Sequence, residues 1–211
     1  MTPAVLDRPW LSFDLGQPMQ VLSWAISRPG FVTARRIVWR EVRNADLPRD
    51  LDVGAWFAQE LAARGEGDSV AFLTSRDVSR FTQSTARAGD VTVDCVATVG
   101  LSNAERVGQR LDRSAQDWGT INIALRLSCG VTQAALIEAL SIAAQARTAA
   151  VMEAGLDLPT GRATGTGTDC IAVAAPEGAE RYAGLHTDLG EAIGAAAYQA
   201  PAEGARAWMA E

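Results

Sequence analysis

The apolar positions along the chain follow two periods, and the shorter one predicts β-strands. Apolar runs, continuous or alternating with polar residues, are typical of strands when turn residues bound them. The first two runs read as a hairpin, because Arg28-Pro29-Gly30 separates them. Residues 75–89 are polar and give no clear pattern. The predicted strands cover residues 19–27, 31–42, 69–74, 91–100, 119–125 and 170–175.

Apolar residues at helical spacing, with capping residues before them, predict helices. The first helix begins after Asp52 and runs to Arg64, with Trp56, Phe57 and Leu61 on its inner face. The longest is expected from Thr132 to Ala154, where Gly155 ends it.

Two further helices are expected from capping-box spacing. Ser102 and Glu105 have this spacing for a helix to about Arg110, and Asp188 and Glu191 have it for the final helix. The final helix carries two glycines, Gly190 and Gly194, that leave one face bare for close packing or a flat ligand. The tail after Pro201 is expected to be loosely held.

The order of these elements favours the α+β class. Strands dominate the first half, and strand–helix units follow only in the second. This order predicts a single mixed β-sheet covered by helices, whereas regular alternation would indicate the alternative, an α/β fold. Residues 1–211 are expected to form one domain, because a chain of this length can bury one sizeable core.

The charge and cysteine content exclude several classes of function. The net charge is −6 and all 19 basic residues are arginine, so neither a nucleic-acid surface nor a lysine Schiff base is expected. Cys95, Cys129 and Cys170 lie far apart in apolar runs, which predicts free thiols in a reducing compartment. No Cys/His cluster occurs in the sequence, so no metal site is expected.

The sequence favours a cytoplasmic protein. Residues 1–11 lack a basic segment followed by an apolar run, so no signal peptide is expected. The longest apolar segment is interrupted by Glu138, Gln145 and Arg147, so no membrane span is expected.

The stretch from Ala163 to Asp169 alternates threonines with glycines and ends in a carboxylate before a buried strand. Gly165 and Gly167 allow a ligand to approach the main chain, and the hydroxyls and N–H groups can converge on an oxyanion or a carbonyl. The competing interpretation is a flexible turn before a core strand.

Two other segments carry polar groups that could join a site. Thr120 and Asn122 share one face of their strand, as surface residues or as a polar pair reaching into a pocket. Ser102 begins a predicted helix after a strand. The N-terminus of this helix could bind an electron-rich ligand group, or it could be an ordinary helix start.

His186 is the sole histidine of the sequence and lies just before the final helix. As a general base it would need an orienting acceptor, for which Asp169 is the candidate, and a water or hydroxyl to activate. The hydroxyl candidates are Thr166, Thr168, Thr120 and Ser102. A purely structural role is the competing interpretation.

Four segments together resemble the adenosylcobinamide amidohydrolase family of corrinoid salvage, in the family's order and at similar spacing, over about residues 70–198. The segments are Gly100-Leu101-Ser102-Asn103-Ala104, Gly119-Thr120-Ile121-Asn122-Ile123, Ala163-Thr164-Gly165-Thr166-Gly167-Thr168-Asp169 and Tyr182-Ala183-Gly184-Leu185-His186-Thr187-Asp188-Leu189-Gly190. The family has small residues where this chain has Ser23-Trp24-Ala25, so that edge of the pocket is expected to differ in shape.

The resemblance implies hydrolysis of the amide that joins the corrin ring's propionyl side chain to its aminopropanol arm. Adenosylcobinamide would become adenosylcobyric acid. The implied partner is a corrinoid small molecule. No cofactor is implied, since cobalt enters only as part of the corrinoid substrate. A homo-oligomer is left open.

Within that reaction, His186 is expected as general base and acid, with Asp169 as its orienting residue. Glu191 is the alternative base, and Thr168 the alternative nucleophile. The amides of residues 165–168 would donate to the oxyanion. The residues expected to contact substrate are Ser102, Asn103, Thr120, Asn122, Gly165, Thr166, Gly167 and Thr187.

Two other functions are compatible with the same residues. A non-catalytic corrinoid carrier or sensor would use His186 as a lower axial ligand to cobalt. A phosphate- or nucleotide-binding enzyme is disfavoured, because the glycine–threonine stretch precedes a strand and lacks the Gly-Lys-Ser/Thr ending of a P-loop.

Overall fold

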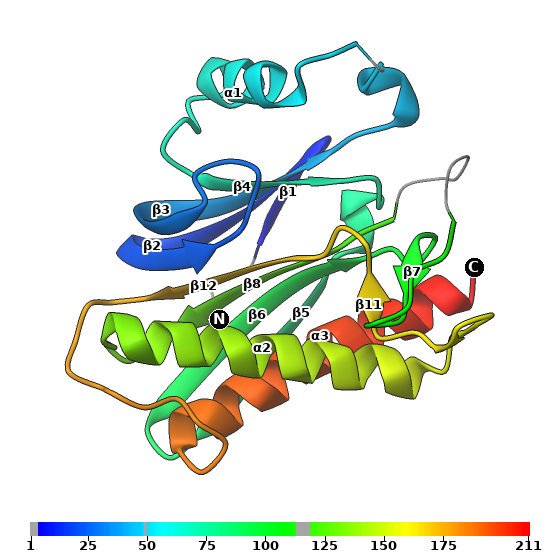
Figure 1. Cartoon of the computed structure of the whole chain (residues 1–211). Helices are drawn as coiled ribbons and strands as arrows, with labels where there is room; N and C mark the ends of the chain where they lie inside the picture. Colours follow the sequence, from blue (N-terminus) through cyan, green and yellow to red (C-terminus); the bar gives the residue numbers. More distant parts are fainter. Residues whose placement is uncertain (1–3, 49, 113–118) are drawn as a thin grey trace.

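One mixed β-sheet of eight strands organises the chain, as predicted for the α+β class. The computed structural model describes residues 4–48, 50–112 and 119–211. The strand order is β4-β3-β2-β12-β8-β6-β5, and β1 pairs with β2 (Figure 1). These strands are β1 (Val5–Asp7), β2 (Trp10–Ser23), β3 (Gly30–Glu41), β4 (Val70–Thr74), β5 (Thr82–Ala88), β6 (Val91–Val99), β8 (Ile121–Leu127) and β12 (Cys170–Ala175).

Short elements complete the fold. Two small ribbons pair β7 (Ala104–Glu105) with β11 (Gly165–Thr166), and β9 (Asp157–Leu158) with β10 (Gly161–Arg162). The helices are α1 (Val53–Ala63), α2 (Gln133–Ala154) and α3 (Asp188–Met209), with 3-10 turns at Asn44–Asp46 and Val78–Arg80.

The helices pack on the outer face of the sheet, with α1 on one half of the strand order and α2 and α3 on the other half. Figure 1 shows α2 and α3 under β12, β8, β6 and β5, with α1 above the β2–β3–β4 half. The side chains of α1 that face the sheet, Phe57 and Leu61, pack against Trp10, Val38 and Ala71 of β2, β3 and β4. The other face of the sheet carries no helix, yet it is lined by a second buried cluster.

That face is buried because the sheet curls over itself. Phe13, Trp39 and Phe72 of the β2–β4 half belong to the same buried cluster as Val96 and Ala124 of β6 and β8. Strand β4 thereby meets β8, from which three strands separate it in the sheet order.

A bulge in β2 lets the sheet bend. The pairing of β2 with β3 shifts between Asp14 and Met19, and Gly16 in this interval has a φ of +84°. Bulges bend a strand and increase its twist. The residues before the bulge pair with β1 and β3, while Gln20–Ser23 beyond it also pair with β12.

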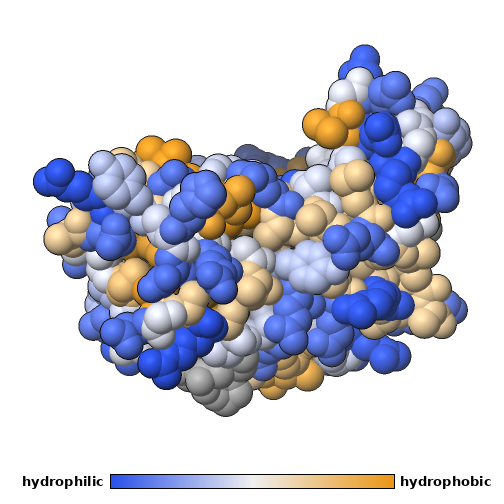
Figure 2. Space-filling view, turned by 90° about the horizontal axis from the view of Figure 1, so that it is seen from below, coloured by the Kyte–Doolittle hydropathy of each residue, from blue (hydrophilic) through white to orange (hydrophobic). Residues whose placement is uncertain are grey.

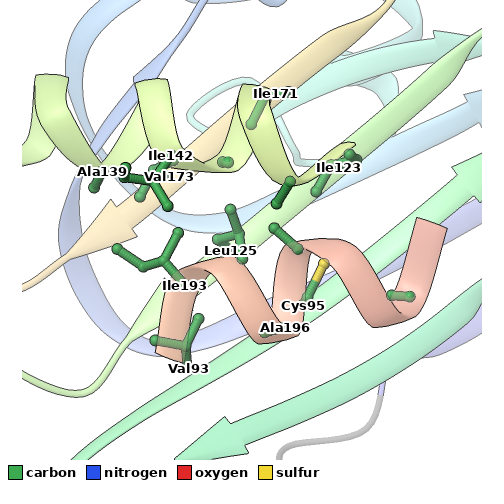
Figure 3. Packing of buried hydrophobic residues seen from close by; sticks show 14 of the residues in the cluster. Val93, Cys95, Ile123, Leu125, Ala139, Ile142, Ile171, Val173, Ile193 and Ala196 are labelled. Atoms are coloured by element: carbon green, nitrogen blue, oxygen red, sulfur yellow. The ribbon is translucent and has the colours of Figure 1, made fainter. Parts of the chain in front are cut away.

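Helices α2 and α3 pack on the sheet through buried apolar side chains. Figure 3 shows Ile142 of α2 and Ile193 of α3 meeting Leu125 and Val173 between the layers. Polar side chains of β5 also bind α3, because Ser84 Oγ donates to Ala196 O at 2.7 Å. Figure 2 shows the outer face of this layer, where hydrophobic residues form small separate groups among hydrophilic ones.

Helix α2 meets, by length and composition, the requirement for crossing a membrane, and within the described residues it is the one helix that does so. Here its Ala135, Ala139 and Ile142 belong to the buried cluster under the sheet.

The predicted caps of α1 and α2 are confirmed. The Asp52 carboxylate accepts from Ala55 N at 3.0 Å, and Thr132 Oγ1 accepts from Ala135 N at 3.3 Å. Gly155 ends α2 in the left-handed region, as predicted.

Three predictions about helices are wrong. Ser102–Arg110 is not a helix, because Glu105 pairs with Gly165 across the β7–β11 ribbon. The cap of α3 is Thr187 rather than Asp188, since Thr187 Oγ1 accepts from Gly190 N at 2.9 Å. The tail after Pro201 is not loose, because α3 continues to Met209.

Gly190→Ala is expected to lower the free energy of unfolding by about 1–3 kcal/mol, because overpacked sites cost this much. The added methyl group would lie 2.0 Å from Gly184 O and 2.6 Å from Ala183 O. Gly194→Ala is the matched control, since its methyl group would meet only Ile142 Cγ2, at 3.9 Å. The control is expected to be neutral or to gain up to about 1 kcal/mol from helix propensity. Thermal unfolding measures both, and equal Tm values would contradict this packing.

Candidate active site

A cavity opens at the seam where β4 meets β8. Its volume is about 570 Å³, a size typical of small-molecule sites. The segments that follow β2 and β3, strand β4, the start of β8 and the loop before β12 all contribute to it. Its lining residues are Trp24, Ile26, Val42, Arg43, Leu47, Phe72, Leu73, Thr74, Ser75, Gly119, Thr120, Asn122, Gly167, Thr168, Asp169 and Cys170.

The seam is closed by a buried amide. Asn122 is 1% exposed, and its Nδ2 donates to Leu73 O of β4 at 2.8 Å. A buried amide needs such partners, so this bond fixes β8 against the opposite edge of the curled sheet. Thr120 and Asn122, the predicted polar pair, both line the pocket. Thr120 Oγ1 lies 3.2 Å from Asn122 Oδ1.

The carboxylate of Asp169 ties the loop before β12 together. It accepts from Thr166 N at 2.9 Å, from Ile121 N at 3.1 Å, and from the Thr166 hydroxyl. The Arg147 guanidinium forms an ion pair with it. Four donors thus surround a carboxylate whose side chain is only 8% exposed. The loop's conformation depends on this one group.

Arg147 reaches the loop from α2. Burial lowers the pKa of its guanidinium, and the adjacent carboxylate stabilises the charged form. Gly165 leaves the space that this pair needs, since a methyl group there would lie 2.5 Å from Asp169 Oδ2 and 2.9 Å from Arg147 Nη1.

Thr168 joins the loop to the two neighbouring segments. Its hydroxyl donates to Gly119 O at 2.7 Å and accepts from Asn103 Nδ2 at 3.2 Å. Its carbonyl accepts from Thr120 Oγ1 at 2.8 Å. Three of the four segments identified in the sequence, 100–104, 119–123 and 163–169, therefore meet at one end of the sheet.

The fourth segment, 182–190, lies elsewhere, and the predicted His186–Asp169 pair is wrong. Asp169 immediately precedes β12, whereas His186 follows its far end. The six residues of β12 span about 20 Å. Figure 1 shows the loop before α3 at the opposite end of the sheet from β7 and β11.

The surroundings of the fourth segment confirm that position. Ala183 N donates to Glu138 Oε2 at 2.7 Å near the start of α2, and Asp188 lies against Gly89 in the β5–β6 turn. His186 is exposed there. Glu191 and Thr187 belong to the same end, in the first turn and at the cap of α3. None of these residues lines the cavity.

The remaining predicted residues lie beside or behind the cavity lining. Asn103 is buried against Thr168, and Ser102 packs against Gly119. Thr166 binds the Asp169 carboxylate, while Gly167 lines the cavity itself.

Two functional residues lie outside the motifs, although each had a weak signal in the sequence. Arg147 is an isolated charge within the alanine-rich helix α2. Trp24 lies in a segment marked as an edge of the pocket, and its Nε1 donates to Asp169 O at 2.7 Å.

Cys170 lines the cavity but is not a suitable nucleophile. Burial raises the pKa of its thiol to about 12, so the thiol is protonated at neutral pH. Among the described residues, no group of three or more His, Cys, Asp or Glu side chains that could hold a metal ion occurs.

Asp169→Asn is expected to lower the free energy of unfolding by about 3–5 kcal/mol, because it leaves the buried Arg147 charge without its partner. Asp157→Asn is the matched control. It breaks the exposed Asp157–Arg162 pair and is expected to cost about 1 kcal/mol or less. Urea unfolding measures both variants. A loss in Asp169→Asn no larger than in the control would show that the loop does not depend on this carboxylate.

Comparison with known proteins identifies the family of the chain. A comparison with curated proteins found no match. The family model for CbiZ, adenosylcobinamide amidohydrolase, matches residues 3–211, which is nearly the whole chain. The chain therefore belongs to the adenosylcobinamide amidohydrolase family.

Proposed function

We propose that this chain hydrolyses the amide of adenosylcobinamide that joins the corrin's propionyl side chain to the aminopropanol arm, releasing adenosylcobyric acid. Family membership supports the class of reaction. The observation that carries the proposal is one cavity in which apolar side chains lie beside fixed polar groups, as a large macrocycle with an amide side chain requires. The apolar side chains are Trp24, Ile26, Phe72 and Leu73; the polar groups belong to Thr120, Asn122, Thr168 and Asp169.

The proposed step is attack of water on the amide carbon. Among the described residues that line the cavity, Asp169 is the only carboxylate, and we assign it as the acceptor of the water proton. Arg147 holds it in place. The carbon–nitrogen bond then breaks, and the proton passes to the leaving amine, so that water is consumed and a carboxylic acid and an amine are formed.

Asp169 must release one of its donors to act in this way. Among the described donors that bind it, the Thr166 hydroxyl is the only neutral side chain. Rotation of Thr166 about χ1 frees one lone pair of Asp169 Oδ1, which keeps its hydrogen bond from Ile121 N, and does not move the backbone. The N–H of Thr168 makes only a 3.4 Å contact with Thr166 Oγ1, so it is available to a developing oxyanion.

The geometry does not favour the Thr168 hydroxyl as nucleophile. It donates to the Gly119 carbonyl, which is not a base, and accepts from the Asn103 amide. A nucleophilic hydroxyl needs a base within hydrogen-bond distance.

Incubation of the purified protein with adenosylcobinamide tests the reaction. Mass spectrometry is expected to show adenosylcobyric acid and free aminopropanol, and in H₂¹⁸O one heavy oxygen in the new carboxylate. Corrinoid that is bound but unchanged would contradict hydrolysis and indicate the carrier instead.

Asp169→Asn is expected to lower kcat by at least about 10²-fold, measured where the variant is folded by circular dichroism, because general-base assistance is lost. His186→Ala is expected to keep kcat/KM close to wild type, since His186 lies at the other end of β12. Loss of activity in His186→Ala, with activity kept in Asp169→Asn, would show that the reaction takes place at the His186 end of the sheet.

Thr166→Val distinguishes attack by water from attack by the Thr166 hydroxyl. It removes the hydroxyl that Asp169 must displace and is expected to retain activity within about tenfold, well short of the loss of a catalytic group. A loss as large as that of Asp169→Asn would identify Thr166 as the attacking group.

A further inference from the structure

We infer that Trp24 is a specificity-determining residue: its indole is a shelf on which the flat ring of the substrate rests, and it couples ring binding to the Asp169 loop. The inference rests on the proposed function for the identity of the ring. It concerns a residue outside all four segments that resemble the family.

The shelf is an exposed apolar surface at the cavity. Trp24 is 47% exposed and Ile26 is 50% exposed, although both line the cavity. Two large apolar side chains that lie side by side at the mouth of a pocket offer a surface that a bound ligand can cover. Deeper in the same cavity lie Phe72 and Leu73 of β4, which are largely buried.

Trp24 is held in a fixed orientation. Its Nε1 donates to Asp169 O at 2.7 Å, which uses the one polar group of the indole. The backbone beside it is fixed too, because Ser23 Oγ donates to Ile171 O at 2.8 Å and accepts from Ala25 N at 3.0 Å. A fixed ring whose N–H is already bonded offers a ligand its apolar face alone.

That chemistry suits a large conjugated ring better than a polar arm. A ring resting on Trp24 places its side chain next to Asp169, because the indole nitrogen itself is in hydrogen-bond contact with the Asp169 carbonyl. The arm then reaches Thr168 and Asp169 while the ring stays on the shelf. Binding energy from the ring is thereby used to position the reacting amide.

Two substitutions separate stacking from the hydrogen bond. Trp24→Ala removes both and is expected to raise KM for adenosylcobinamide at least about tenfold, as expected for loss of a stacked aromatic. Trp24→Phe keeps an aromatic face and loses the N–H donor. It is expected to hold KM within about threefold and to lower kcat, because the Asp169 loop loses a tether.

Matched controls come from the other end of the sheet. Tyr182 is 66% exposed and Leu185 is 67% exposed, and neither lines the cavity. Tyr182→Ala and Leu185→Ala are expected to leave KM and kcat unchanged, whereas Ile26→Ala is expected to raise KM. Circular dichroism and Tm confirm that each variant is folded.

Binding of adenosylcobyric acid, the proposed product, tests the shelf independently of turnover. Titration is expected to show Kd raised at least about tenfold by Trp24→Ala and little changed by Trp24→Phe. Unchanged KM and Kd in Trp24→Ala, with turnover intact, would overturn the shelf and leave the hydrolase proposal standing. Corrinoid binding that depends on Trp24, without cleavage by wild type, would overturn the hydrolase proposal and leave the shelf standing.

Discussion

The buried carboxylate of Asp169 is the interaction on which this site depends. It receives donors from its own loop at Thr166, from β8 at Ile121 and from α2 at Arg147, while its carbonyl receives the indole of Trp24. A buried charge is tolerated only when it is paired and hydrogen-bonded, so the Asp169 carboxylate needs several of these contacts at once. One residue thereby fixes the relative positions of four parts of the chain that are far apart in sequence.

The curl of the sheet creates the space that this carboxylate organises. The bulge around Gly16 bends β2, so the β2–β4 half folds over β12, β8 and β6, and the two halves share one buried cluster. Closure brings β4 against β8, where Asn122 binds Leu73 O. The cavity is the gap that remains at this seam, which explains why its walls combine apolar strand residues with loop hydroxyls.

Sequence patterns predicted the parts of the fold that depend on local chemistry. Asp52, Thr132 and Gly155 cap their helices because each satisfies backbone groups within a few residues. The same reasoning failed at Ser102–Glu105, where pairing with a segment about 60 residues away replaced a helix. The start of β2 was also missed, because Gly16 and Pro18 in the bulge look like a turn.

For the site, three of the four segments were correctly predicted to come together. The pairing of Asp169 with His186 overlooked the strand predicted between them at residues 170–175, because a strand places the residues before and after it at opposite ends of a sheet. Arg147 and Trp24 reach the loop through tertiary packing alone, so no local pattern indicated their partners.

In the proposed reaction, the reacting amide binds at the Asp169 end of the sheet. The decisive measurement is a crystal structure of the protein with adenosylcobyric acid. In that structure we expect the corrin ring against Trp24 and the free propionate beside Thr168 and Asp169. A corrin bound beside His186, at the starts of α2 and α3, would contradict it.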